Sequence, residues 1–163
     1  MTGEILKIIR DVHQLFTEKG LKLSVAESCT GGLISHYLTW LAGSSVFFDA
    51  GVVTYSASSK ENILGISPET IASHGVVSKE TAKEMAAKMR LLTGTDYALS
   101  TTGNLGPDVL EGKERGLIYI GINKGGKTVI KELRLTGDRT QNKEEAALSS
   151  LRFLIDQLSE QKQ

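Results

Sequence analysis

Residues 24–38 read SVAESCTGGLISHYL, and this stretch decides the fold. The segment from Leu21 to Ala26 predicts a short strand, and the residues from Leu33 onward carry apolar side chains at helical spacing. Between the two, Ser28 lies on a bend and a pair of glycines precedes the helix. A strand, a tight turn and a helix in this order are typical of layered α/β proteins.

The rest of the chain continues this alternation in both directions. Capping residues, glycine stops and apolar periodicity mark the other expected elements. The expected helices are 2–19, 33–41, a short one capped by Ser58 with Glu61, one from Pro68, 79–93, and one after Asp138. The expected strands are 21–26, 47–55, 97–102, and a hairpin of 117–123 with 128–135. We expect one domain over residues 1–163, a three-layer α/β/α sandwich around a mixed sheet of about five or six strands, with a fraying tail at Ser159–Gln163.

Composition and charge argue against several classes of protein. The chain has 163 residues, and its 19 basic and 19 acidic side chains give no formal net charge. Broad electrostatic binding to nucleic acid or to an anionic membrane is therefore not expected. No apolar run approaches the roughly 20 residues of a membrane span, and the charged N-terminus does not resemble a signal peptide. The single cysteine, Cys29, excludes an internal disulfide and a cysteine-based zinc site. We expect a cytoplasmic protein without a metal site.

Residues 121–128, GINKGGKT, match the phosphate-binding pattern G-x-x-x-x-G-K-[ST]. That motif needs a helix directly after the loop, but the residues that follow begin with β-branched side chains and soon reach Gly137. A hairpin turn at Gly125-Gly126 is the favoured interpretation.

Three side chains suggest a site at the strand ends, where open α/β sheets bind ligands. Ser28 lies on the bend, while Lys60 and Arg139 each fall in the first turn of an expected helix. A cation there faces the positive end of the helix dipole, at a cost of roughly 0.3–1 kcal/mol. A catalytic role explains this placement, because burial, a nearby arginine and the dipole all lower the pKa of a lysine. The N–H groups at Gly31 and Gly32 could bind a phosphate or an oxyanion, although a plain helix cap explains the same residues.

Four motifs resemble, in order, the C-terminal domain of the competence/damage-inducible protein CinA. They are AESCTGG (26–32), AGSSVFFDAGVVTYSASSK (42–60), HGVVS (74–78) and GDR (137–139). That family includes stand-alone nicotinamide-nucleotide amidases. The resemblance implies a serine/lysine amidohydrolase that converts nicotinamide mononucleotide to nicotinate mononucleotide and ammonia. It implies a small-molecule nucleotide as substrate, no metal or organic cofactor, and a homodimer.

The same resemblance implies roles for individual residues. Ser28 is the nucleophile, Lys60 the general base, and Tyr55 an auxiliary that can hydrogen-bond the pair. Arg139 lies in the site, where it holds the substrate phosphate, keeps Lys60 neutral, or both. The residues implied to bind substrate are Thr30, Gly31, Gly32, Thr101, Thr102 and Gly103.

The loop at 103–116 departs from the family pattern. Members commonly read TGIAGP, a glycine pair and KPVG, where this chain reads TGNLGPDVL and KERG. A nucleotide-binding or regulatory module without catalysis is therefore the alternative. Cys29 is a second candidate nucleophile beside Ser28, although a small buried thiol is the commoner state. Glu27 is expected either to orient the site or to cap backbone amides. Direct contact with DNA is not expected from a chain without a basic stripe.

Overall fold

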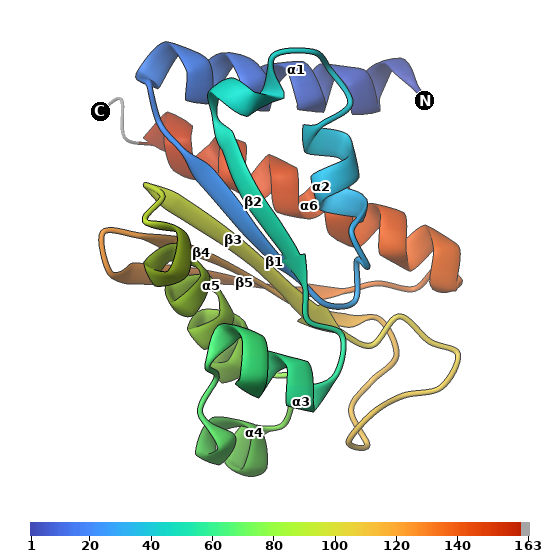
Figure 1. Ribbon diagram of the computed structural model, residues 1–163. Helices are drawn as coiled ribbons and strands as arrows, with labels where there is room; N and C mark the ends of the chain where they lie inside the picture. Colours follow the sequence, from blue (N-terminus) through green and yellow to red (C-terminus); the bar gives the residue numbers. More distant parts are fainter. Residues whose placement is uncertain (161–163) are drawn as a thin grey trace.

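The computed structural model describes residues 1–160 and places a mixed sheet between two layers of helices (Figure 1). The strands are β1 (Leu23–Glu27), β2 (Phe48–Val53), β3 (Tyr97–Gly103), β4 (Leu117–Lys124) and β5 (Lys127–Arg134). They form a 5-stranded sheet in the order β2-β1-β3-β4-β5. β1 runs parallel to both β2 and β3, whereas β4 and β5 form an antiparallel hairpin. The predicted three-layer α/β fold with a mixed sheet is confirmed.

The helices divide between the two faces of this sheet (Figure 1). One face carries α1 (Gly3–Lys19), α2 (Leu33–Leu38) and α6 (Arg139–Glu160). The other carries α3 (Ala57–Ser59), the π-helical turn η2 (Lys60–Leu64), α4 (Pro68–His74) and α5 (Lys79–Thr93). A short 3-10 turn, η1 (Ser44–Val46), precedes β2. α6 includes Ser159 and Glu160, which were expected to fray, and the remainder of that tail lies outside the described residues.

Two apolar cores hold the layers together. The larger one lies between the sheet and α1, α2 and α6, and includes Ile9, Phe16, Leu99 and Leu151. The smaller one lies on the face covered by α5 and η2, and comprises Ala26, Leu64, Ile66, Met85, Met89 and Ala98. Each large aliphatic side chain buried in this way contributes about 1.5–3 kcal/mol. The cores lock the strands in register, and that register positions the strand ends.

Local capping chemistry explains where most helices begin. Ser78 accepts a hydrogen bond from the N–H of Thr81 at 3.0 Å, so α5 starts where the sequence predicted. The prediction for the short helix was wrong, because its cap is Ser56 and not Ser58. The Ser56 side chain accepts from the N–H of Ser59 at 3.1 Å, and the Ser59 hydroxyl caps Ser56 in return. Several serines in a row offer competing caps, and only the extended backbone at Ser56 decides between them. α2 also ends at Leu38, earlier than predicted.

The phosphate-loop pattern at 121–128 is a hairpin turn. Gly125 and Gly126 both have positive φ, 58° and 82°, and they join β4 to β5 with Lys124 opposite Lys127. Two successive positive φ angles are the signature of the turn that matches the twist of paired strands. No helix follows this loop, so the interpretation as a hairpin is confirmed.

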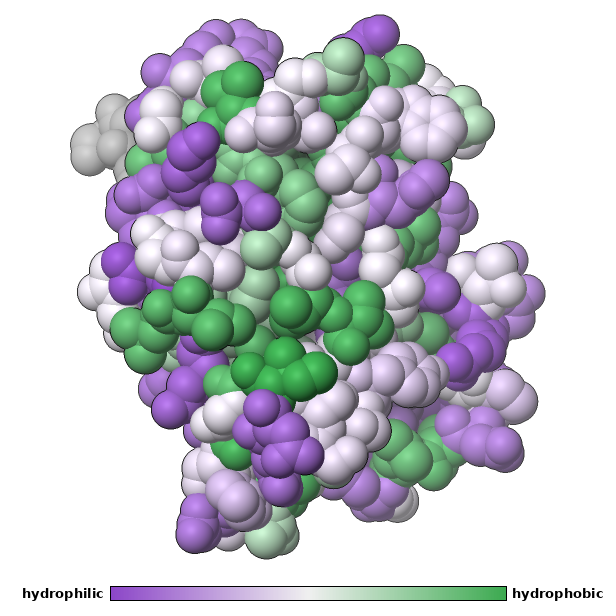
Figure 2. All heavy atoms as spheres, in the orientation of Figure 1, coloured by the Kyte–Doolittle hydropathy of each residue, from purple (hydrophilic) through white to green (hydrophobic). Residues whose placement is uncertain are grey.

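β2 forms one edge of the sheet. Figure 2 shows apolar side chains gathered on the face of the molecule that β2 borders. Exposed large apolar side chains in and near this strand include Val46, Val53, Tyr55 and Ile63. Among residues 1–160, none of the helices combines the length and the hydropathy that a bilayer-spanning segment requires.

The three parallel strands end at the same edge of the sheet. From this edge the chain leaves β1 toward α2 on one face and leaves β2 toward α3 on the opposite face. β3 ends beside them and continues into the 103–116 loop. Crevices at such points are where open α/β sheets bind ligands.

Candidate active site

The bend after β1 is built around the carboxylate of Glu27, which is completely buried. Its Oε1 accepts hydrogen bonds from the Thr30 hydroxyl at 2.7 Å and from the N–H groups of Gly32 at 3.2 Å and Ile34 at 3.0 Å. Its Oε2 accepts from the N–H of Ser35 at 3.0 Å and from the Ser35 hydroxyl at 2.7 Å. Glu27 therefore caps the start of α2 and fixes the turn in which Ser28 lies.

This cap contradicts the prediction that the N–H groups of Gly31 and Gly32 bind an anion. The Gly32 N–H does not face outward to receive an anion, because it already donates to Glu27. The Gly31 N–H donates to the carbonyl oxygen of Ser28 at 3.0 Å. The expected anion site at the two glycines is thus filled by atoms of the protein itself.

Lys60 contacts Ser28 directly, although 32 positions separate them in the chain. The Lys60 Nζ lies 2.9 Å from the Ser28 Oγ and 2.7 Å from the backbone carbonyl oxygen of Thr54. Lys60 is only 1% exposed and Ser28 only 7%. The two residues come from different elements, since Ser28 follows β1 whereas Lys60 begins η2 after β2. The convergence predicted for the strand ends is confirmed for this pair.

Burial lowers the pKa of the Lys60 ammonium from 10.5 to about 8, because the charged form loses hydration. The negative charge of Glu111 acts in the opposite direction but does not offset this effect. A lysine with this pKa is partly neutral near pH 8. A neutral Nζ can accept a proton from the Ser28 hydroxyl while it donates to the Thr54 carbonyl.

Cys29 does not share these properties. Its side chain is buried, and burial raises the pKa of the thiol to about 12. The thiolate is the nucleophilic form of cysteine, and it is not populated at neutral pH with this pKa. The chemistry of this bend therefore favours Ser28 over Cys29.

A cavity of about 230 Å³ opens next to Ser28. Its polar lining includes Ser28, Tyr55, Thr102, Asn104, Asp108 and Arg139, and its apolar lining includes Val76, Val77, Leu105 and Leu110. The apolar side chains come from the 74–78 turn and from the 103–116 loop. The cavity therefore offers both apolar walls and polar side chains to a small group.

Arg139, the first residue of α6, lines this cavity. Its guanidinium donates to the carbonyl oxygen of Gly106 at 2.8 Å and to the Tyr55 hydroxyl at 2.9 Å. The Tyr55 hydroxyl therefore meets Arg139, and the structure records no hydrogen bond from it to Ser28 or Lys60. Tyr55 is 60% exposed, so it lies at the rim and not beside the pair.

The residues implied to bind substrate fall into two groups. Thr102 and Gly103 line the cavity. At Gly103 an added Cβ would lie 2.7 Å from the carbonyl oxygen of Leu117, so β4 approaches closely only because no side chain is present. Thr30 and Thr101 are fully buried, and their hydroxyls bond each other at 2.9 Å, which ties the bend to β3. Thr30, Gly31 and Gly32 build the bend, Thr101 belongs to β3, and none of the four lines the cavity.

The near end of the 103–116 loop is tied to α6 and to itself. The Asn142 side chain donates to the carbonyl oxygen of Leu105 at 3.0 Å. The buried Asn104 accepts from the N–H of Leu110 at 3.1 Å and points its amide nitrogen at the carbonyl oxygens of Leu110, Lys113 and Glu114. The loop departs from the family pattern, yet hydrogen bonds within it and to α6 hold it as a wall of the cavity.

Sequence reasoning missed several parts of the site. The Thr54 carbonyl is a backbone atom, and no side-chain pattern reports where it points. Val76 and Val77 lie in a motif that carried the resemblance, yet nothing in their type indicated a cavity wall. Asn104 and Asp108 could have been singled out as polar residues in a loop at a strand end.

The chain is thus a three-layer α/β domain in which a buried serine and a buried lysine meet where the parallel strands end. The family model of the CinA C-terminal domain matches residues 6–158, and the chain belongs to this family. It is 44% identical over 153 residues to a CinA-like protein of Chloroherpeton thalassium, covering 89% of this chain and 36% of that protein. The chain spans roughly a third of the length of the curated relatives it matches.

Solved structures agree with this assignment along almost the whole chain. The competence/damage inducible protein CihA from Agrobacterium tumefaciens superposes with a TM-score of 0.92 at 35% identity, covering 98% of each chain. The competence damage-inducible protein A (ComA) from Klebsiella pneumoniae gives a TM-score of 0.93 at 31% identity, covering 95% of this chain and 97% of that one.

Proposed function

We propose that this domain is a serine/lysine amidohydrolase that deamidates nicotinamide mononucleotide to nicotinate mononucleotide and ammonia. The observation that carries the proposal is the 2.9 Å contact between the Lys60 Nζ and the Ser28 Oγ in a buried setting. A lysine that is 1% exposed loses hydration, and the lowered pKa makes it a base near pH 8.

The proposed reaction has two steps that share the same base. Neutral Lys60 takes the proton of the Ser28 hydroxyl as Oγ forms a bond to the carboxamide carbon. Lys60 then gives this proton to the amide nitrogen, so ammonia leaves and an ester links the acyl group to Ser28. In the second step Lys60 takes a proton from water, the resulting hydroxide attacks the ester carbon, and the proton returns to the departing Ser28 Oγ. The sum consumes one water for each ammonia released.

The N–H group of Cys29 is the proposed donor to the oxyanion. Cys29 adjoins Ser28 and lines the cavity, and within residues 1–160 its N–H donates to no backbone or side-chain oxygen. In comparable hydrolases, loss of one such donor costs about 2.7–4 kcal/mol of transition-state stabilisation. This assignment replaces the glycine amides, of which Gly32 is engaged by Glu27 and Gly31 by Ser28.

The cavity supports a pyridine nucleotide as substrate. Its apolar walls, formed in part by Val76, Val77 and Leu110, suit the face of a pyridine ring. At the rim, Arg139 offers a guanidinium, which binds phosphate with paired donors. The ring would then present its carboxamide to Ser28 while the phosphate remains near the rim.

An ammonia-release assay over a panel of nicotinamide compounds tests the proposal. Wild-type protein is expected to release ammonia from the mononucleotide faster than from nicotinamide or its riboside. Ser28→Ala and Lys60→Ala are each expected to lower the rate at least about 10³-fold with an unchanged circular dichroism spectrum. Full activity in either variant contradicts the mechanism, and Ser58→Ala is the control because its hydroxyl lies on the exposed surface of α3.

The second candidate is a nucleotide-binding or regulatory module without catalysis. The altered 103–116 loop favours it, because this loop lines the cavity and differs from the family pattern. Isothermal titration with the mononucleotide beside the ammonia assay separates the two candidates. Binding without turnover supports the module, and turnover excludes it.

We also propose that the protein is a homodimer through the edge strand β2. This strand is unpaired on one side, and the apolar side chains near it are exposed. Such edges readily pair with a second chain. Light scattering after size exclusion is expected to give twice the mass of the chain, and Val53→Lys is expected to reduce it to that of a monomer.

A further inference from the structure

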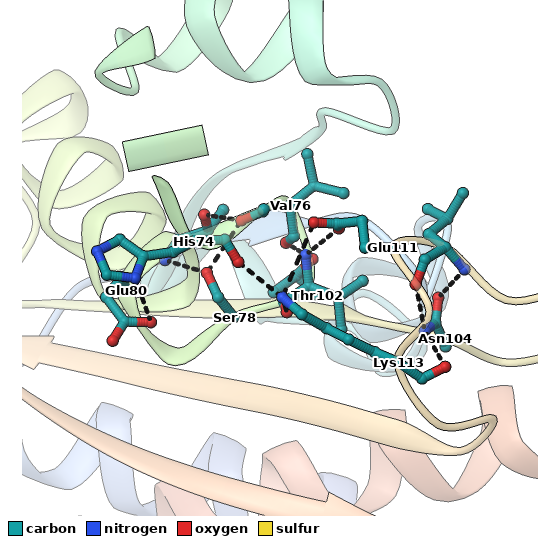
Figure 3. A network of polar contacts seen from close by, with 12 residues as sticks. His74, Val76, Ser78, Glu80, Thr102, Asn104, Glu111 and Lys113 are labelled. Carbon is teal, nitrogen blue, oxygen red and sulfur yellow. Dashed lines mark hydrogen bonds and ion pairs between the residues drawn. The ribbon is translucent and has the colours of Figure 1, made fainter. Parts of the chain in front are cut away.

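Glu111 and Lys113 of the 103–116 loop hydrogen-bond to the backbone of the turn between α4 and α5 (Figure 3). The Lys113 ammonium donates to the carbonyl oxygen of His74 at 2.6 Å and to that of Val77. The Glu111 carboxylate accepts from the N–H of Val77 at 3.0 Å and lies 3.8 Å from the Lys113 Nζ. Both polar backbone groups of Val77 are therefore bound by side chains from a distant loop.

The two segments joined by these contacts both line one cavity. The 74–78 turn contributes Val76 and Val77, and the 103–116 loop contributes Asn104, Leu105, Asp108 and Leu110. The base of the turn is held separately, since the Thr102 hydroxyl donates to the carbonyl oxygen of Val76 at 2.6 Å. The Glu111 and Lys113 contacts therefore tie together two segments that line the same cavity.

The local backbone is adapted to these contacts. Glu111 has φ of 62°, and among residues 1–160 it is the only residue other than glycine with a positive φ. Opposite it, Gly75 has φ of 82°, and a Cβ there would overlap the Glu111 carboxylate. A backbone conformation that is costly for a glutamate persists where the surroundings require it, and such positions gather at functional sites.

We propose that Glu111 and Lys113 are positioning residues that hold the cavity walls at the spacing needed to bind the nucleotide part of the substrate. This inference rests on the proposed amidase function. Neither side chain lines the cavity, so neither touches the reacting atoms. Their loss should weaken substrate binding and leave the chemical step at the Ser28–Lys60 pair nearly intact.

Steady-state kinetics of ammonia release from nicotinamide mononucleotide test the proposal. Lys113→Ala is expected to raise KM at least about 10-fold while kcat changes by less than about 3-fold. Lys113→Arg, which keeps donors for the two carbonyl oxygens, is expected to recover most of the loss. Lys127→Ala is the matched control, since Lys127 is an exposed lysine at the β4–β5 turn, at the far end of the sheet.

A second readout does not depend on catalysis. Thermolysin cleaves before apolar residues, and Val109 and Leu110 are exposed near the middle of the loop. Lys113→Ala and Glu111→Ala are expected to speed cleavage at these bonds at least about 5-fold relative to wild type and to Lys127→Ala. Unchanged cleavage overturns the positioning role even if the wild-type protein proves to be inactive.

The kinetic outcomes also distinguish other roles. A fall in kcat with unchanged KM overturns the proposal, as does a shift of the pH–rate profile in Glu111→Gln without a change in KM, because Glu111 would then act electrostatically on Lys60. Absence of wild-type turnover contradicts the amidase function alone. In that case faster thermolysin cleavage of Lys113→Ala still supports the wall-holding role.

Discussion

The bend at 27–35 and the loop at 103–116 face the same cavity but are held in opposite ways. The bend closes on a single buried carboxylate, and every donor to Glu27 lies within eight positions of it in the chain. The loop combines the internal contacts of Asn104 with contacts to distant elements, from Asn142 at one end and to the 74–78 turn at the other. The bend is thus a local structure that carries the nucleophile, whereas the loop is also held by elements far from it in the chain.

This difference suggests that the bend and the loop have separate roles, the bend in positioning Ser28 and the loop in forming a wall of the cavity. We expect the local contacts of Glu27 to keep Ser28 in place when distant parts of the domain are changed. The long-range contacts of the loop keep it against the cavity. The departure from the family pattern falls in the loop and not in the bend.

Removing the carboxylate at the centre of the bend should have the largest effect on stability. Glu27→Gln places an amide group among donors that need acceptors, and Glu27→Ala leaves all of them unpaired. We expect losses of about 3–5 kcal/mol in the free energy of unfolding, measured with urea. Glu18→Gln, on the exposed surface of α1, should change it by less than about 0.5 kcal/mol. A near-neutral Glu27→Gln would mean that the bend is held by other contacts.

The buried lysine should make stability depend on pH. The unfolded chain binds the Lys60 proton up to pH 10.5, whereas the folded chain releases it near pH 8. Unfolding therefore takes up a proton in this window, and the free energy of unfolding rises as the pH increases through it. We expect a gain of about 2 kcal/mol between pH 7 and pH 9.5 relative to Lys60→Met. An equal pH dependence of both proteins would contradict the lowered pKa.

The same titration predicts the pH dependence of activity. Only neutral Lys60 can accept the Ser28 proton, so kcat/KM should rise with pH, reach half its maximum near pH 8 and level off above it. An acid limb centred well below pH 7 would point to a different base.

A smaller effect is expected from loss of the hydrogen bonds that Asn104 makes within the 103–116 loop. Asn104→Ala removes the acceptor for the N–H of Leu110 and the donor near three carbonyl oxygens. We expect a loss of about 1–2 kcal/mol in unfolding free energy, and a higher KM with little change in kcat. Asn62→Ala, at an exposed position of η2, is the control. A fall in kcat at constant KM would show that the loop acts on the chemistry itself.

The smallest effect is expected at the rim. Tyr55→Phe removes only the hydroxyl that accepts from Arg139, at a position that is 60% exposed. Exposed hydrogen bonds contribute little, so kcat/KM should fall by no more than about 5-fold. A loss above about 100-fold would place the hydroxyl on the reacting atoms.

The fold could be predicted because its signals are local. Glycine stops, serine caps and apolar periodicity mark α5 and the hairpin to within a residue or two. The error at Ser58 arose where neighbouring serines compete, since only the backbone conformation selects Ser56. Tertiary structure, not propensity, makes that selection.

The site was predictable only in part. The meeting of Ser28 and Lys60 followed from the resemblance and from strand ends that share one edge. The grip of Glu111 and Lys113 on backbone atoms of the 74–78 turn was not predictable, because the partners are carbonyl and amide groups that every residue carries. Contacts to backbone leave no signature in the partner's side chain.

The Thr54 carbonyl oxygen is a second functional backbone atom that the side-chain pattern does not reveal. It is the second partner of the Lys60 Nζ, yet it belongs to the main chain. An alanine scan would not detect its role, because alanine substitution keeps the backbone carbonyl. Replacing the peptide linkage between Thr54 and Tyr55 by an ester, through chemical ligation or nonsense suppression, would weaken this acceptor while keeping every side chain. The basicity of the Lys60 amine can therefore be tuned through a backbone atom, which substitution among the twenty standard amino acids does not remove.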